Sequence, residues 1–382
     1  MHIILEDIEP IRTNLKPLTL TCPAGALPAG INDTIAERWQ RLIPGATTGY
    51  ETEPYLAAKY PRGEGRLKVC GHVVPDRALA DAVAALEEGE YLTDADGTTI
   101  AVMGRPVTPR TFSGEITAYR SLPDIFRSSK ARITADFDLL TAGRESAPLP
   151  DSCTLIGDPS RLFIEPGAEV EGVFINTKTG PVYIGAGAEV QEAVVLRGPV
   201  AIGPACRVRA GARLLPGTCL GPVTRVGGEI SNTVFLGYSN KQHDGFLGDA
   251  VIGRWVNIGA ECVASNLKND YSEIRLWNYG SRRFERTGLQ FCGLIMGDHT
   301  KAAINTTFNT ATVVGVGCNI HGFGYPRPFV ASFTDGGLQT TGRVILKKMI
   351  QTATIAMSHR GVEITPEDID IITHLYNNEP DA

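Results

Sequence analysis

The chain has 382 residues, of which 43% are hydrophobic and 20% are charged, so it can bury the core of more than one domain. Its net charge of −6 argues against a general nucleic-acid partner, and no apolar run is long enough for a membrane-spanning helix. The first residues lack the basic segment of a secretory signal, and the eight cysteines contain no CxxC pair, so we expect a cytoplasmic protein without a zinc site.

Residues 1–105 predict a small α/β unit, and residues 106–150 predict a connector to the next domain. Neither segment shows an internal repeat, so the expected elements come from apolar patterns and capping residues. These elements are a strand at residues 3–5, a helix capped within residues 32–34, a helix that begins at Asp76 and ends at Gly89, and a helix at residues 133–141.

Residues 151–330 carry a six-residue repeat of aliphatic side chains. A helix cannot follow this period, and a hairpin sheet has no reason for it, whereas short strands joined by evenly spaced corners do. Three hexapeptides form one triangular coil of a parallel β-helix, with the aliphatic side chains stacked inside. The clearest run is Ile184, Val190, Leu196, Ile202, Val208, Leu214, Leu220 and Val226.

The repeat is interrupted twice. It breaks after Val226 and resumes at Phe246, then breaks again and returns at Met296. Three cysteines, Cys206, Cys262 and Cys318, occupy the small position four residues after the aliphatic one, so we expect them to be buried. Residues 331–382 turn helical, with one helix around residues 344–350 and another that begins after Thr365.

Two motifs carry a family resemblance. The segment 248–260, with Asn266-Leu267 after it and His243 before it, resembles the acetyltransferase half of bifunctional glucosamine-1-phosphate acetyltransferase/N-acetylglucosamine-1-phosphate uridyltransferases (GlmU-like proteins), above all the archaeal type. The resemblance implies a left-handed β-helix and a homotrimer with sites between subunits. It also implies acetyl-coenzyme A-dependent N-acetylation of an amino-sugar phosphate or a nucleotide amino sugar.

The second motif, residues 15–23, resembles the start of a sugar-phosphate nucleotidyltransferase, within a shortened domain. Two features that hold the triphosphate in that family are absent: the preceding residues contain no glycine, and Ala24 stands where the family has a lysine. A surviving nucleotidyltransferase, which would need Mg²⁺, is therefore one alternative function. A non-catalytic scaffold that binds a sugar nucleotide is the other.

The acetyltransferase resemblance also assigns site residues. His243 takes the place of the general base, since imidazole titrates near neutral pH. Asn266 takes the place of a catalytic amide, whose N–H groups suit a developing oxyanion. The remaining candidates are Asn257, Phe246, Arg209 or Arg213, and Arg275 for the substrate, and Ala260 and Lys301 for acetyl-coenzyme A. No histidine–carboxylate spacing indicates a metal.

Several alternatives stay open at these positions. His243 lies where the repeat slips by two residues, which we expect to free its side chain from the interior. Phe246 replaces a family tyrosine, and its six-residue phase favours a core position. Asparagine turns or ladders are the alternative for Asn257 and Asn266. Ser231 and Ser272 stand at basic positions of the family, and residues 271–290 form either a cationic arm or a solvated excursion.

Overall fold

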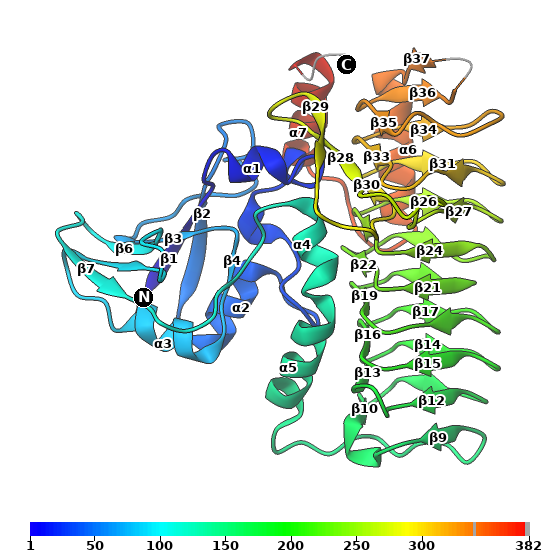
Figure 1. Ribbon diagram of the computed structural model, residues 1–382, viewed down its shortest axis with the longest axis horizontal. Helices are drawn as coiled ribbons and strands as arrows, with labels where there is room; N and C mark the ends of the chain where they lie inside the picture. Colours follow the sequence, from blue (N-terminus) through cyan, green and yellow to red (C-terminus); the bar gives the residue numbers. More distant parts are fainter. Residues whose placement is uncertain (339–340, 379–382) are drawn as a thin grey trace. The chain divides into compact units, whose positions relative to one another are not determined.

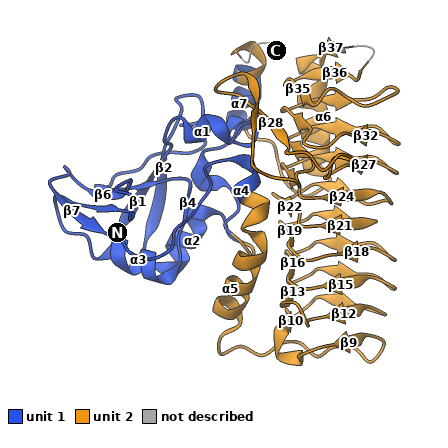
Figure 2. Ribbon diagram, in the orientation of Figure 1, with its two compact units in different colours: residues 1–29, 33–124, 366–374 blue, residues 30–32, 125–365, 375–382 orange. Residues whose placement is uncertain are grey.

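The computed structural model describes residues 1–338 and 341–378, which form two compact units (Figures 1 and 2). Unit 1 comprises residues 1–29, 33–124 and 366–374. Unit 2 comprises residues 30–32 and 125–365 together with the chain from residue 375 onward. Within the described ranges, no helix is both long enough and apolar enough to cross a membrane.

Unit 1 is built on a six-stranded mixed sheet with the order β2-β1-β3-β6-β5-β7. Strands β1, β2 and β3 are parallel, and β6 runs antiparallel to β3 and β5. The sheet strands are β1 (His2–Glu6), β2 (Thr47–Glu51), β3 (Leu67–Cys70), β5 (Glu90–Thr93), β6 (Thr99–Met103) and β7 (Thr108–Thr111), and a separate pair is formed by β4 (Val73–Val74) and β8 (Thr117–Ala118).

The predicted helix starts of unit 1 are confirmed. Helix α2 (Ile35–Leu42) begins with a capping box in which Thr34 and Glu37 satisfy each other's backbone N–H groups. Helix α3 (Arg77–Ala84) begins at Asp76, whose carboxylate accepts from the Leu79 N–H at 2.8 Å. Its predicted end at Gly89 is wrong, because the helix already ends at Ala84. The chain then turns, and the Glu90 carboxylate accepts from the Glu87 N–H in that turn. The short helices are α1 (Ile11–Asn14), η1 (Leu18–Leu20), η2 (Ala24–Ala26) and, at the join to unit 2, α4 (Leu122–Arg127).

Unit 2 is the predicted parallel β-helix, whose strands stack rung upon rung in Figure 1. Three sheets form its faces, which we name after their first strands. The β10 sheet contains β10 (Leu162–Ile164), β13 (Val182–Ile184), β16 (Val200–Ile202), β19 (Thr218–Leu220), β22 (Val234–Phe235), β25 (Val251–Ile252), β30 (Ile295–Met296), β33 (Val313–Val314) and β35 (Phe329–Val330).

The β11 sheet forms the second face and the β9 sheet the third. The β11 sheet contains β11 (Glu169–Val170), β14 (Glu189–Val190), β17 (Arg207–Val208), β20 (Arg225–Val226), β23 (Asn240–Lys241), β26 (Asn257–Ile258), β31 (Lys301–Ala302), β34 (Asn319–Ile320), β36 (Thr334–Gly336) and β37 (Thr341–Arg343). The β9 sheet contains β9 (Thr154–Ile156), β12 (Phe174–Asn176), β15 (Val195–Arg197), β18 (Arg213–Leu214), β21 (Glu229–Ser231) and β24 (Phe246–Gly248), followed by the pair β27 (Val263–Ala264) and β32 (Thr307–Phe308).

The inward side chains form one continuous core. The predicted aliphatic residues from Ile184 to Val226 are at most 1% exposed, and Cys206, Cys262 and Cys318 are buried as expected. Each buried aliphatic side chain contributes about 1.5 to 3 kcal/mol relative to an exposed one. Phe246 is a correction: it is half-buried and faces outward, and Leu247 fills the interior instead.

Helices α5 (Ser129–Thr141) and α6 (Leu346–Ser358) belong to unit 2 together with the β-helix. Helix α5 contains the predicted residues 133–141 and packs against β16 and β19, with the Ser129 hydroxyl donating to the Gly217 carbonyl. Helix α6 begins near the predicted position and buries Met349, which lies close to Gly317. Helix α7 (Pro366–Asn378) begins at the predicted proline.

Candidate functional site

His243 lies on a corner of the β-helix, between β23 and β24. The corner contains four residues, 242–245, as do the corners 209–212 and 259–262 on neighbouring coils. The slip in register therefore lies before this corner and not at it, and the side chain of His243 lies outside the interior, as expected. The chain is shortened one coil earlier, by two residues at the corner Gly227-Gly228 and by one more between Ile230 and Phe235. Lys241 therefore follows Val226 in register after 15 residues, whereas Val226 follows Val208 after 18. His243 is exposed on this ordinary corner.

A buried lysine supports the His243 corner. Lys241 is 1% exposed and takes the interior position that Val226 and Ile258 fill on the coils before and after it. Its ammonium donates to the carbonyls of His243 at 2.5 Å, Asp244 at 3.2 Å and Gly227 at 3.3 Å. These bonds satisfy the buried charge with neutral acceptors, and burial lowers the pKa of Lys241 to about 8.

The interior lysine accompanies a loss of side chains at the neighbouring corners. The corner position that holds the buried Ala212 and Cys262 on other coils is Gly228 on the coil before Lys241 and Gly245 on the coil of Lys241 itself, so no corner side chain enters the interior there. The lysine fills that space and pairs the carbonyls around it. Sequence reasoning missed Lys241 because the repeat breaks there; its position between Val226 and Ile258 was the available signal.

Three other candidates gather on the β11 sheet and its corner. Asn257 is exposed and pairs in register with Lys301, and Ala260 lies three residues further along on the corner. The Lys301 ammonium donates to the Trp255 carbonyl, and burial lowers the pKa of Lys301 to about 8. Asn257 accepts from the Asn240 amide at 3.2 Å, which is the ladder contact that its sequence position left open.

Phe246 and Asn266 meet at another place, the corner between the β9 and β10 sheets. A Cβ atom added to Gly248 would lie 2.6 Å from Phe246 Cζ and 2.9 Å from Asn266 Nδ2, so both side chains cover this glycine. The Asn266 amide donates to Asp249 at 2.7 Å, and Asp249 also accepts from Asn232 at 2.6 Å. One N–H of the Asn266 amide is therefore used in an asparagine–aspartate ladder.

The structure does not bring His243 and Asn266 together within one chain. His243 precedes β24, whereas Asn266 follows β27, the strand that lies against β24. The two side chains consequently lie at opposite ends of these strands, on different corners of the β-helix.

The two candidate phosphate arginines differ in their surroundings. Arg213 lies on the outer face of the β9 sheet, where its guanidinium donates to Glu229 at 3.1 Å. Arg209 is exposed and lies beside Gly227, below the His243 corner. Arg209 is therefore the better placed of the two to meet a phosphate near His243.

A pocket of about 690 Å³ lies beside Asn266, between the β-helix and an arm. The arm is the hairpin of β28 (Arg275–Asn278) and β29 (Arg283–Arg286), and its Trp277 stacks on Phe329 at 4.2 Å. The Arg275 guanidinium donates to the Phe284 carbonyl at 3.0 Å. The pocket is lined by Ser265, Leu267, Lys268, Asn269, Asp270, Arg275, Phe284, Asn309, Thr310, Tyr325 and Pro328.

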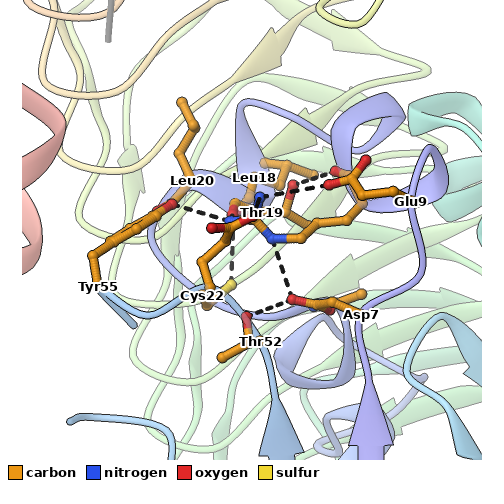
Figure 3. A network of polar contacts seen from close by, with 11 residues as sticks. Asp7, Glu9, Leu18, Thr19, Leu20, Cys22, Thr52 and Tyr55 are labelled. Carbon is orange, nitrogen blue, oxygen red and sulfur yellow. Dashed lines mark hydrogen bonds and ion pairs between the residues drawn. The ribbon is translucent and has the colours of Figure 1, made fainter. Parts of the chain in front are cut away.

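Unit 1 contains a buried polar network at the position of the family's phosphate loop (Figure 3). Arg12 is 3% exposed, lies 3.2 Å from the Asp7 carboxylate, and donates to the Thr19 carbonyl at 2.9 Å and the Tyr55 hydroxyl at 3.0 Å. Asp7 also accepts from the Thr52 hydroxyl at 2.5 Å. Burial raises the pKa of Asp7, against smaller lowering effects of Thr52, Ala24 and Arg12.

Adjacent to this network is a pocket of about 270 Å³ lined by Glu6, Asp7, Glu9, Arg12, Glu51, Thr52, Glu53 and Pro54. Five of these residues are acidic, and the one arginine is already engaged by Asp7. Among the residues described, no three histidine, cysteine or acidic side chains group closely enough to hold a metal ion. The pocket therefore does not fit a magnesium–triphosphate group.

Comparison with known proteins finds a sugar nucleotidyl transferase family model and partial similarity to bifunctional enzymes. Residues 2–145 match the family model described as sugar nucleotidyl transferase. A bifunctional protein GlmU from Methanocaldococcus jannaschii is 31% identical over 90 residues, which is 24% of this chain and 21% of the relative. A bifunctional sugar-1-phosphate nucleotidylyltransferase/acetyltransferase from Sulfurisphaera tokodaii is 29% identical over 93 residues, covering 24% and 23% of the two chains.

The matched segments thus span less than a quarter of these curated relatives. A solved AntD mutant, an N-acyltransferase from Bacillus cereus in complex with dTDP and coenzyme A, covers 54% of this chain and 91% of its own at 13% identity, and its TM-score of 0.23 establishes no shared fold. The family-model match, the partial similarity to the curated proteins and the β-helix bear out the resemblance to GlmU-like nucleotidyltransferase/acetyltransferases.

Proposed function

We propose that the protein is an acetyl-coenzyme A-dependent N-acetyltransferase of nucleotide-sugar metabolism that acts on an amino-sugar phosphate or a nucleotide amino sugar. The observation that carries the proposal is the exposed His243 on a corner fixed from inside by Lys241. A general base must be accessible and held in place, and this arrangement supplies both properties. The name of the partial relative from Sulfurisphaera tokodaii, a nucleotidylyltransferase/acetyltransferase, agrees with it.

In the proposed reaction, bound acetyl-coenzyme A supplies an activated acetyl group. The acceptor amine attacks the thioester carbonyl, and His243 takes the proton that the amine loses. The tetrahedral intermediate then breaks its carbon–sulfur bond, and coenzyme A leaves as the free thiol after its sulfur receives that proton. The Asn266 amide has two N–H donors, and one of them is bonded to Asp249. The second N–H is the one that would donate to the oxyanion. Lys301 and the backbone of Ala260, which lie near Asn257, are the residues that would contact the coenzyme.

A homotrimer completes this proposal. Because His243 and Asn266 lie on different corners of one chain, a site that uses both needs a neighbouring copy to present the second corner. The pocket beside Asn266, with Lys268, Arg275 and Asn309, has the polar lining that suits the hydroxyl and phosphate groups of the acceptor.

The test is release of free thiol from acetyl-coenzyme A in the presence of a panel of amino-sugar phosphates and nucleotide amino sugars. We expect release that requires an acceptor and falls at least about a hundredfold in His243→Ala, the scale of a general base. The exposed His359→Ala is the matched control and should retain activity. No release with any acceptor, from folded wild-type protein, would overturn the proposal.

A second candidate, nucleotidyl transfer by unit 1, has the family-model match over residues 2–145 in its favour. The acidic pocket around Arg12 argues against it, because carboxylates repel a triphosphate. Pyrophosphate release from nucleoside triphosphate and a sugar 1-phosphate, with Mg²⁺ present, would establish this activity. Ligand binding without either reaction would instead favour a sugar-nucleotide-binding scaffold.

A further inference from the structure

Three arginines converge on the outer face of the β11 sheet, in the same outward column as Asn257 and Lys301 and at a different place from the His243 corner. Arg207 and Arg225 are register partners on the neighbouring strands β17 and β20, and Asn240 follows Arg225 on β23. Neighbouring strands lie about 4.8 Å apart, so the two guanidinium groups leave the sheet side by side. The third arginine, Arg360, follows helix α6 and donates to Asn240 Oδ1 at 2.6 Å and to the Val223 carbonyl at 3.3 Å.

The protein neutralises this cluster only in part. Arg207 forms an ion pair with Glu189 at 2.6 Å, whereas the two contacts of Arg360 are with neutral acceptors. Within residues 1–338 and 341–378, the guanidinium of Arg225 makes no hydrogen bond or ion pair, although the side chain is partly buried between its neighbours. Three positive charges therefore face one carboxylate.

Burial and the neighbouring positive charges act on the cluster together. Partial burial and then the neighbouring Arg207 lower the pKa of Arg225 from its ordinary value, and Glu189 opposes this shift. Burial, followed by the charges of Arg225 and Arg207, likewise lowers the pKa of Arg360. A guanidinium does not lose its proton under ordinary conditions, so a bound anion is the means of relieving the repulsion in this cluster.

We infer that Arg207, Arg225 and Arg360 form a binding site for a phosphate or pyrophosphate group. The planar guanidinium presents parallel N–H donors that match phosphate oxygens, and several arginines together recognise a group with more than one negative charge. Arg225 lies in register between Arg207 and Asn240, the residue that accepts from Arg360, and its guanidinium has no competing partner, so it is expected to be the main contact. The site depends on neither His243 nor Asn266 and stands whether or not acetyl transfer is found.

The experiment measures the melting temperature of the full-length protein in phosphate-free buffer, with added inorganic phosphate, pyrophosphate, adenosine diphosphate or coenzyme A. Sodium chloride at equal ionic strength is the reference. We expect pyrophosphate to raise the melting temperature by several degrees more than the salt, as mass action requires for a ligand that binds only the folded state. Similar stabilisation by all the phosphate compounds indicates a general phosphate site. Stabilisation by pyrophosphate, with a larger effect of the nucleotides, indicates that the phosphates of a nucleotide are the natural ligand.

Two variants make the result decisive. Arg225→Gln should abolish the pyrophosphate effect yet leave the ligand-free melting temperature equal or higher, because a repulsive charge is removed; a merely structural arginine would lower it. Arg197→Gln, at an exposed position on β15, should keep the wild-type response. The inference is overturned if pyrophosphate acts no differently from salt, or if Arg225→Gln responds to pyrophosphate like the wild type. It is also overturned if the Arg225→Gln substitution changes the oligomeric state, measured by light scattering, because the cluster would then belong to a contact between subunits.

Discussion

Arg12 in unit 1 and Lys241 in unit 2 are both buried cations, and their partners differ in kind. Arg12 meets the Asp7 carboxylate and links it to the segments that carry Thr19 and Tyr55. Lys241 meets only backbone carbonyls, two of them on the corner that carries His243. The comparison teaches that a buried ion pair cross-links a unit, whereas a buried ammonium among neutral acceptors fixes one loop.

The largest effect is expected for the ion pair. Arg12→Met leaves Asp7 buried without its opposite charge, and removing one partner of a buried pair typically costs about 3 to 5 kcal/mol. We therefore expect a loss of this size in the free energy of unfolding of unit 1, measured by urea denaturation. Arg66→Met, in the exposed pair with Glu88, is the matched control and should cost less than about 1 kcal/mol. Equal losses in the two variants would show that the Asp7–Arg12 pair does not stabilise unit 1.

A smaller effect on stability, with a larger consequence for activity, is expected at Lys241. Lys241→Met fills the interior but leaves the carbonyls of Gly227, His243 and Asp244 unpaired, which should cost about 2 to 3 kcal/mol. With the corner released, kcat of the acetyl transfer should fall about tenfold or more with little change in KM, because Lys241 acts as a positioning residue and does not touch the substrate.

The control for this variant uses the same side chain one coil further on. Ile258→Met replaces an aliphatic residue of the same interior column, and such volume-conserving exchanges usually cost less than about 1.5 kcal/mol. It should leave kcat unchanged. If Ile258→Met and Lys241→Met reduce kcat alike, the loss reflects general loosening of the β-helix, and the positioning role of Lys241 is wrong.

The same contrast marks the limits of prediction from sequence. The β-helix was predictable because an aliphatic residue recurs at every sixth position over many coils. Each coil therefore adds independent evidence for the same column of interior side chains. Lys241 was not predictable, because its meaning depends on a two-residue deletion at Gly227-Gly228, one coil earlier. Phe246 was misplaced because the interior residues Leu247 and Ile252 are five residues apart, so that a count by six back from Ile252 ends at Phe246.

In unit 1, local signals such as the Thr34 capping box were sufficient for helix starts. The Arg12 network could not be predicted from the sequence. Arg12 contacts Tyr55, which lies more than forty positions further along the chain, and no periodic pattern indicates such a contact. The motif at residues 15–23 indicated the family, whereas the chemistry of the neighbouring pocket emerged only when Glu51 and Glu53 were seen to face it.

The smallest effect concerns a third buried basic group, His72, whose pH dependence separates it from Arg12 and Lys241. His72 is 6% exposed, and burial, with a further contribution from Arg120, lowers its pKa to about 4 from 6.5. Because the folded state binds this proton less readily than the unfolded state, stability is fully present above about pH 6.5 and is lost as the pH falls toward 4. Between pH 7 and pH 5 we expect a loss of about 1 to 2 kcal/mol from this group, measured by urea denaturation of unit 1. In His72→Phe, which keeps a ring of similar size and cannot be protonated, that part of the pH dependence should vanish. Between pH 7 and pH 5 the free energy of unfolding should therefore fall less in the variant than in the wild type. Identical pH dependence in the two proteins would mean that His72 titrates normally and that the turn holding it opens to water.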